Sequence, residues 1–261
     1  MPEPLPSWTR PHFTPDGGCA LLFYVVFGTF DLSRPLSRSL YRTTGMPEWL
    51  ELVSNDRTSH PETITGYQSG PVWEMYHRKD PSLVRVAEQA TQTITLRAEV
   101  YDPPDLDYFR DTIGVVTYLL DCGGVAVSDM QQLKLWSVDE WRQTVFAPNK
   151  PVPRQHVVIL TSPEENDPEL LWFHTRGLRQ YGRPDLSVRR VGTAYREAIT
   201  HLLDRLIELH AYGGVIEEEQ EVRMHDLPPG GVCQHAGELD DPDFNNIHVE
   251  IVWPGDVLAE S

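Results

Sequence analysis

The sequence predicts an α+β protein with mixed, largely antiparallel sheets, one β-α-β unit and two main amphipathic helices packed on the sheets. Three observations favour this class. A strand, a helix and a second strand follow one another between residues 94 and 128. Two apolar runs flank the polar, proline-containing segment 162–169, which is the spacing of a hairpin. Residues 194–211 place apolar side chains at three- and four-residue intervals, the pattern of a helix with one buried face.

The start of the chain predicts an arm and then strands. Prolines at positions 2, 4, 6, 11 and 15 fix their own φ and bias their predecessors away from helix, so residues 1–17 should form a proline-rich extended arm. The β-branched and aromatic run 20–27 predicts a central strand, and 64–67 and 72–76 predict shorter ones. Between these runs, residues 31–60 have no clean period.

The β-α-β unit is the clearest local pattern. Residues 94–101 alternate as a strand, and Asp102 is placed to cap the helix that should follow, with a proline in its first turn. The apolar face of this helix should consist of Leu106, Phe109, Ile113, Val116 and Leu120. Gly123-Gly124 should end the helix, and 125–128 should return as a strand. Ser137-Val-Asp-Glu140 matches a capping box, which predicts a short helix through Trp141.

Three prolines in the segment 147–153 suggest an internal joint. We therefore expect residues 18–261 to form one α+β domain, with two subdomains joined near 147–154 as the alternative. Beyond the joint, the apolar runs predict strands at 156–161, 170–175, 186–191, 215–224 and 247–253.

Charge and composition limit the class of function. The chain has a net charge of −17, and residues 214–261 hold twelve Asp and Glu against the single Arg223. An acidic protein repels phosphate backbones, so nucleic acid is not an expected partner. A basic partner protein is the natural complement. Three widely spaced cysteines and a start without a basic region and apolar run predict a cytoplasmic protein, with no membrane partner.

The richest cluster of chemistry lies between Trp172 and Leu186. His174, Arg176, Arg179, Tyr181 and Arg183 are the candidate ligand-binding residues. Forked guanidinium donors suit carboxylate or phosphate, and a histidine could act as acid or base near neutral pH. The alternative is structural: the arginines could pair with Glu217, Glu218, Glu219 or the acids around Asp240, and so hold down the last strands.

Other candidate sites carry weaker signals. Asp241-Pro-Asp243-Phe-Asn245 resembles half of a calcium loop, but the loop's sixth and twelfth positions depart from that pattern. His235 and His248 flank this turn without a recognised metal-site spacing. Cys122 lacks a local histidine that could activate it, and Asp129 follows a strand. These patterns predict no metal site, no cofactor and no assigned catalytic residue.

The segment from His174 to Leu186 also carries a resemblance, together with Gly123–Asp129 and Ser137–Trp141. It resembles uncharacterised bacterial domains of unknown function with a His-Thr-x-Gly-Leu-x-x-x-Gly-x-Pro-Asp/Glu motif, over roughly residues 94–212. The resemblance implies an intracellular bacterial α+β domain and no established activity. The composition, with nineteen Arg and three Lys, fits a bacterial gene of high GC content.

Two hypotheses follow. The first is a non-enzymatic protein-interaction module, of the immunity or accessory type, that binds a basic protein. The second is an enzyme or small-molecule sensor that holds an anionic ligand through the arginine and histidine cluster.

Overall fold

The computed structural model describes residues 5–15 and 17–259 and divides the chain into two compact units. Unit 1 contains the chain up to Thr9, Leu21–Val100 and Asp105–Val152. Unit 2 contains Arg10–Ala20, Tyr101–Pro104 and the chain from Pro153 onward. The expected arm is thus shared between the units, because Trp8 is buried in unit 1 and Arg10 in unit 2. Residues 1–4 and 16 of that arm lie outside the described residues.

Helices and two sheets confirm the predicted α+β class. The sheet of unit 1 has the order β2 (Leu50–Asp56), β3 (Gln92–Tyr101), β1 (Cys19–Gly28), β4 (Gly124–Asp129), β5 (Lys134–Ser137). The β2–β3, β1–β4 and β4–β5 pairs are antiparallel. The predicted strand-helix-strand sequence exists as β3, α5 (Asp107–Asp121) and β4. Because β1 lies between β3 and β4, the unit is a split β-α-β.

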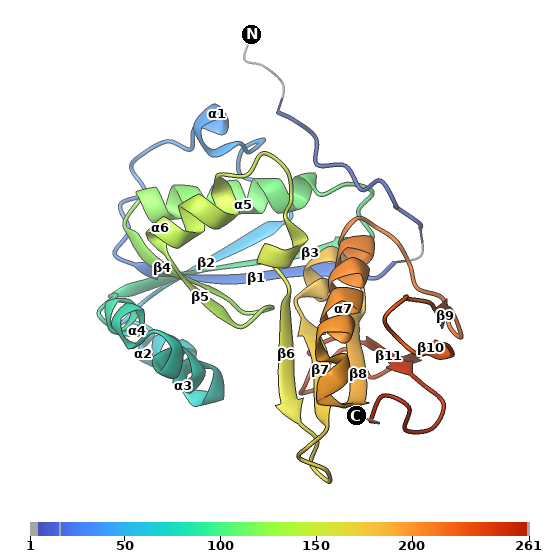
Figure 1. Ribbon diagram of the computed structural model, residues 1–261. Coiled ribbons are helices and arrows are strands. Elements are labelled where there is room, and N and C mark those ends of the chain that lie inside the picture. The colour runs from blue at the N-terminus through green and yellow to red at the C-terminus, as the bar shows by residue number, and fades with distance from the viewer. Residues whose placement is uncertain (1–4, 16, 260–261) are drawn as a thin grey trace. The chain divides into compact units, whose positions relative to one another are not determined.

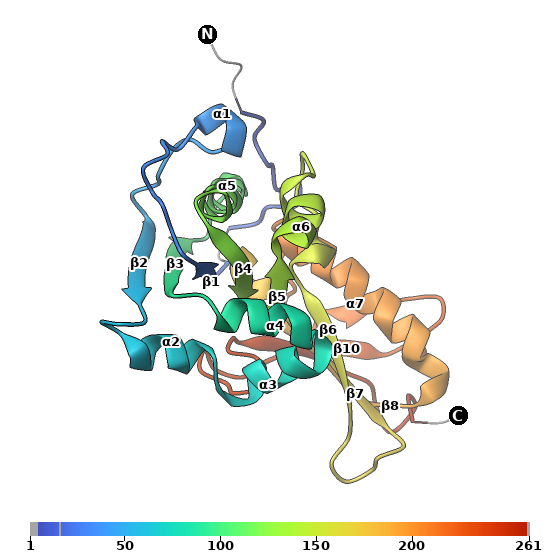
Figure 2. The same ribbon diagram turned by 90° about the vertical axis from the view of Figure 1, so that its left-hand side faces the viewer.

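Helices cover both faces of this sheet, as Figures 1 and 2 show. Helices α5 and α6 (Val138–Glu140) lie on one face, and α1 (Arg38–Tyr41) packs on α5. Helices α2 (Pro61–Tyr67), α3 (Gly70–Lys79) and α4 (Pro81–Glu88) lie on the other. Successive side chains of β1 point to opposite faces of the sheet, so some pack against α5 and α6 and others against α2, α3 and α4. Tyr24 contacts Trp141 at a ring-centroid distance of 5.8 Å, whereas Phe27 contacts Trp73 at 5.6 Å.

The expected strands at 64–67 and 72–76 were wrong, because both segments lie in helices. Each helix begins with a proline in its first turn, where the missing amide has no helical partner to lose. Trp73 and Tyr76 then lie three residues apart on one buried helical face. Their aromatic content indicated β structure, but burial against β1 decided the outcome.

Asp102 is not the helix cap that the sequence predicts. Helix α5 starts at Asp107 with Leu106 at its N-cap, and Asp102 has a φ of 32° and pairs with Arg183 in unit 2. The serine half of the second capping prediction is confirmed, since the Ser137 hydroxyl accepts from the Glu140 amide at 3.2 Å, whereas the Glu140 carboxylate pairs with Lys134 at 2.8 Å. The chain continues from α6 as a π-helical segment, Trp141–Phe146.

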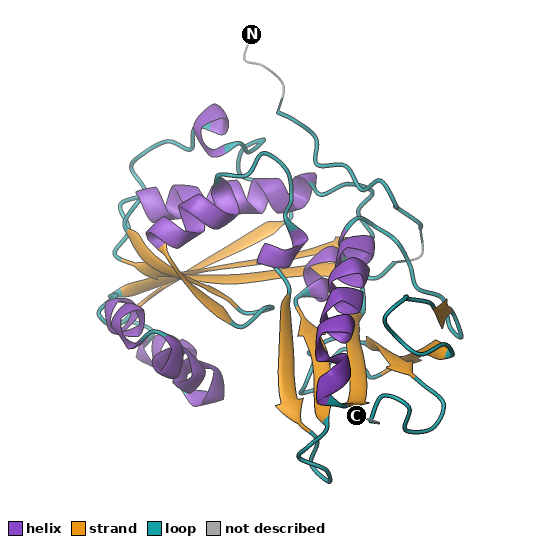
Figure 3. Ribbon diagram, viewed as in Figure 1, coloured by secondary structure: helices purple, strands orange, loops and turns teal. Residues whose placement is uncertain are grey.

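The sheet of unit 2 has the order β6 (Val158–Pro163), β7 (Leu171–Arg176), β8 (Asp185–Val191), β11 (His248–Val252), β10 (Gly231–Ala236), β9 (Glu221–Val222). Strands β6 and β7 form the predicted hairpin, whereas β8 and β11 are parallel. Helix α7 (Arg196–Ala211) packs along this sheet and confirms the predicted helix (Figure 3). Among the described residues, no helix is both long enough and apolar enough to cross a bilayer.

The last strands differ from expectation. Of the segment 215–224, only β9 is a strand, and β10 was not predicted. Strand β10 buries Cys233 but exposes Gln234 and His235 in succession, so it lacks the alternation that identifies a half-buried strand.

Candidate functional site

The segment from Trp172 to Leu186 runs through β7, the 3-10 turn Leu178–Tyr181 and the start of β8. Alternation along β7 puts Trp172 and His174 on one face. His174 lies directly opposite Ser187 of β8, and Ser187 lies opposite Glu250 of β11. One row of polar side chains therefore crosses three strands of unit 2.

Stacked rings cover this row. Trp172 stacks on His174 with a centroid distance of 4.0 Å, and Phe244 stacks on His248 at 4.0 Å. Phe244 also meets His174 edge-on at 5.5 Å. The ring of Phe244 is buried, although it belongs to the acidic turn that precedes β11. This packing anchors the segment 237–247 on the sheet.

Burial makes these histidines poor acids and bases at neutral pH. Desolvation lowers the pKa of His174 to about 4, with neighbouring Arg176 and Arg189 contributing in the same direction. Burial also lowers the pKa of His248. A general acid or base works best with a pKa near the operating pH. The His174 ring is therefore neutral at pH 7, and both rings act as packing surfaces.

Arg176 and Arg179 hold the segment 237–247 through hydrogen bonds to its backbone. The Arg176 guanidinium donates to the Asp243 carbonyl at 3.0 Å. Arg179 donates to the carbonyls of Leu239 at 3.1 Å and Asn245 at 2.6 Å. These contacts agree with the structural alternative in location, because the arginines do hold this segment. The contacts differ from that alternative in chemistry, since the acceptors are backbone carbonyl oxygens and not carboxylates.

Arg183 is buried in the interior of unit 2. Its guanidinium forms an ion pair with Asp102 at 3.0 Å, and both side chains are nearly inaccessible to solvent. It also donates to the backbone carbonyls of Thr14, Gly182, Gly213 and Gly214. Tyr181 is fully buried as well, and its carbonyl accepts from Arg10 at 2.9 Å. The five predicted ligand-binding residues therefore divide between the interior and the 237–247 segment.

The two glycines of this region serve backbone packing. Gly177 has a φ of 120°, and a Cβ there would lie 2.3 Å from the His156 carbonyl oxygen. Gly182 has a φ of 64°, and a Cβ there would lie 2.4 Å from the Gly18 carbonyl oxygen. Both glycines thus allow close contact with the backbone of other segments of unit 2.

Asp185 is the most perturbed acid of the unit. It accepts from the Thr175 hydroxyl at 2.8 Å, the Leu178 amide at 3.3 Å and the Asn246 side chain at 2.9 Å. Desolvation by complete burial raises its pKa to about 6, against the lowering effect of these three donors. The carboxyl group therefore links β7, β8 and the start of β11 from inside the sheet.

The other sequence candidates have local structural roles. Asp129 accepts from the amides of Gln131 and Gln132, and Asp241 accepts from those of Asp243 and Phe244. Cys122 is buried at the end of α5. His235 bonds the Ile216 carbonyl at 2.8 Å. In the described part of the chain, no three His, Cys, Asp or Glu side chains are grouped to hold a metal ion.

Sequence reasoning missed three residues that organise this region. Phe244 was considered only as part of a possible calcium loop, whereas its ring is buried. The side-chain amide of Asn246 donates to the backbone carbonyl of Arg183 and to the carboxylate of Asp185. Arg10, in the proline-rich arm, donates to Pro103, Tyr181 and His210 carbonyls. Hydrogen bonds between residues so far apart in sequence give no pattern within a short stretch of the sequence.

Fold and site together define an α+β protein in which Arg176, Arg179 and Arg183 bind backbone carbonyls of unit 2, while most acids of the segment 217–243 are exposed. Comparisons with protein-family models, curated proteins and solved structures give no match. The resemblance to uncharacterised bacterial domains stays a prediction that rests on the motif at 174–186.

Proposed function

We propose that the protein is a non-enzymatic interaction module whose segment 217–243, here called the acidic segment, binds a basic protein partner. The acidic segment contains nine Asp and Glu against Arg223. Eight of the nine are exposed, and Asp241 is partly buried. Such a surface attracts a basic partner from a distance and raises the rate of encounter.

The single observation that carries the proposal is the lack of internal neutralisation. Only Glu218, Glu221 and Asp226 have an ion-pair partner within 4.0 Å among the described residues. The remaining six acids have none, and they are Glu217, Glu219, Glu238, Asp240, Asp241 and Asp243. Arg176 and Arg179 bind the Asp243 and Leu239 carbonyls, so they hold the end of this segment while its carboxylates stay available.

An apolar anchor lies among these charges. Leu239 is 57% exposed between Glu238 and Asp240, and its carbonyl is held by Arg179. Ile247, at the end of the same turn, is 40% exposed. Interfaces commonly combine a small apolar centre with a polar rim, and the acidic segment has both components.

The proposal predicts strong salt dependence. Association with a basic test protein, measured by biolayer interferometry, should slow by about tenfold or more as sodium chloride rises from 10 to 150 mM, because the Debye length falls from about 30 to about 8 Å. An association rate that does not change with salt would contradict it. The anion-binding alternative gives a different result, namely thermal stabilisation by phosphate or sulfate that is lost in Arg179→Ala.

A further inference from the structure

A pocket opens in unit 2 where two parallel strands separate. The ladder between β8 and β11 runs from the Asp185–His248 pair to the Ser187–Glu250 pair and then ends. Beyond it, β8 continues beside β7 and β11 continues beside β10. The crevice at the carboxyl ends of diverging parallel strands is a common position for ligands in α/β sheets. Here it holds a cavity of about 180 Å³.

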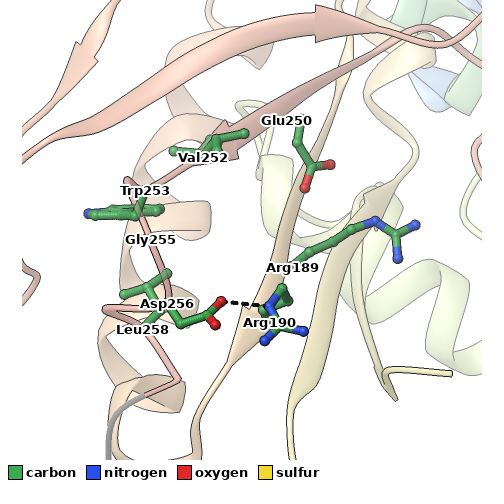
Figure 4. A pocket seen from close by; sticks show the side chains of 9 residues that line it. Arg189, Arg190, Glu250, Val252, Trp253, Gly255, Asp256 and Leu258 are labelled. Atoms are coloured by element: carbon green, nitrogen blue, oxygen red, sulfur yellow. Dashed lines mark hydrogen bonds and ion pairs between the residues drawn. The ribbon is translucent and has the colours of Figure 1, made fainter. Parts of the chain in front are cut away.

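Both apolar and charged side chains line the pocket (Figure 4). Val252, Trp253 and Leu258 supply the apolar lining. The charged lining consists of Arg189, Arg190, Glu250 and Asp256. The pocket could therefore hold a short apolar stem next to a charged group.

The two cations of the pocket already have anionic partners. Arg190 binds Asp256 at 2.8 Å, the contact drawn in Figure 4. Arg189 binds Glu164 at 3.3 Å, and its guanidinium lies 3.9 Å from the centre of the Trp172 ring. Neither arginine is left with an unmatched positive charge.

Glu250 is the one charge of the lining without an Arg or Lys partner within 4.0 Å among the described residues. Its side chain is 18% exposed, and the nearest ion-pair candidate is the His248 imidazole at 4.0 Å. Burial lowers the pKa of that imidazole, which disfavours its charged form. Burial raises the pKa of Glu250, while a hydrogen bond from Ser187 and the charge of Arg189 act in the opposite direction. A buried carboxylate without an ion pair of its own gains free energy from a ligand that supplies a cation in direct contact.

We propose that this pocket binds a primary ammonium group carried on a short alkyl stem, with Glu250 as the acceptor and Trp253, Val252 and Leu258 around the stem. A free alkylamine and a lysine side chain of another protein share this chemistry. The inference goes beyond the proposed function, because it holds whether or not the acidic segment binds a partner.

The test uses n-butylammonium chloride and the indole N–H resonance of Trp253. This indole lines the pocket and donates to the Pro228 carbonyl at 2.8 Å, so it reports locally in a two-dimensional NMR titration. We expect a saturable shift with butylammonium and none with 1-butanol. Glu250→Gln should weaken the affinity by at least about tenfold, the loss typical of a hydrogen bond to a charged group.

Two further variants serve as a charge control and as a second test of the pocket. Glu165→Gln removes the same charge from an exposed position and should leave the affinity unchanged. Val252→Trp alters a partly exposed wall residue without touching Glu250, and should also weaken binding by filling the pocket. An equal response to 1-butanol, an unchanged affinity in Glu250→Gln, or no saturable shift in the folded wild type would each overturn the proposal.

Titration with Nα-acetyl-lysine-methylamide separates the two sources of the ammonium group. Binding at least as tight as that of butylammonium assigns the site to a lysine side chain. Butylammonium binding without binding of the lysine derivative assigns it to a free amine.

Discussion

Arg183→Ala should lower the free energy of unfolding by about 3–5 kcal/mol, the cost of breaking a buried ion pair from one side. The variant leaves the Asp102 carboxylate buried without its cation, and it removes the guanidinium donor from four backbone carbonyls. Two of these, Gly182 and Gly213, keep a backbone amide donor. Urea denaturation followed by circular dichroism measures the change.

Two comparisons make this result specific. Arg205→Ala removes an exposed arginine from α7 and should change stability by no more than about 0.5 kcal/mol. The double variant Arg183→Ala, Asp102→Ala should lose less than the sum of the two single losses, because it leaves no lone buried charge. A loss below about 1 kcal/mol in Arg183→Ala would mean that the guanidinium is not structural, and would return Arg183 to the list of ligand-binding candidates.

Asp185→Asn should alter how stability depends on pH. Burial raises the pKa of Asp185 from its ordinary 3.8 to about 6, so the folded state binds this proton more tightly than the unfolded state. Well below pH 3.8 the group is protonated in both states and has no effect on stability. As pH rises, ionisation increasingly favours the unfolded state, by a total of about 3 kcal/mol once the pH is well above 6.

The asparagine variant lacks this titration. Whatever its stability at one pH, it should gain about 2 kcal/mol relative to the wild type between pH 4 and pH 6.5. Denaturant titrations at several pH values measure this difference, with Glu165→Gln as an exposed acid for comparison. Parallel curves for wild type and Asp185→Asn would show that the pKa of Asp185 is not raised.

The sequence predicts the elements whose periodicity is local and strong. The apolar face of α7, the hairpin of β6 and β7, and the cap at Ser137 could all be identified from a few neighbouring residues. Strand β1 was identified because a buried central strand has a continuous β-branched and aromatic run. Helices α2 and α3 were misassigned because their aromatic residues outweighed the proline signal at their starts.

The candidate site could be predicted only in part, for a physical reason. Composition identified the arginines and the acids, and it offered two roles for the arginines. Which role each one has depends on partners that are distant in sequence. Arg183 finds Asp102 across 81 residues, and Arg179 finds Leu239 across 60. The pocket next to Glu250 depends on where two parallel strands part, which no local pattern encodes.

The central claim is that the acidic segment, rather than net charge alone, binds a basic protein. The most direct test compares two triple variants that each remove three negative charges. One changes the acidic segment, through Glu238→Gln, Asp240→Asn and Asp243→Asn. The other changes exposed acids of unit 1, through Glu48→Gln, Glu51→Gln and Glu74→Gln.

The measurement is the association rate with the same basic protein at 10 mM salt. If the acidic segment is the binding surface, its variant should associate about tenfold more slowly than the wild type, whereas the unit 1 variant should stay within about twofold, because steering depends on charges near the contact. Equal slowing in the two variants would contradict the claim, since it would show that only the overall charge matters.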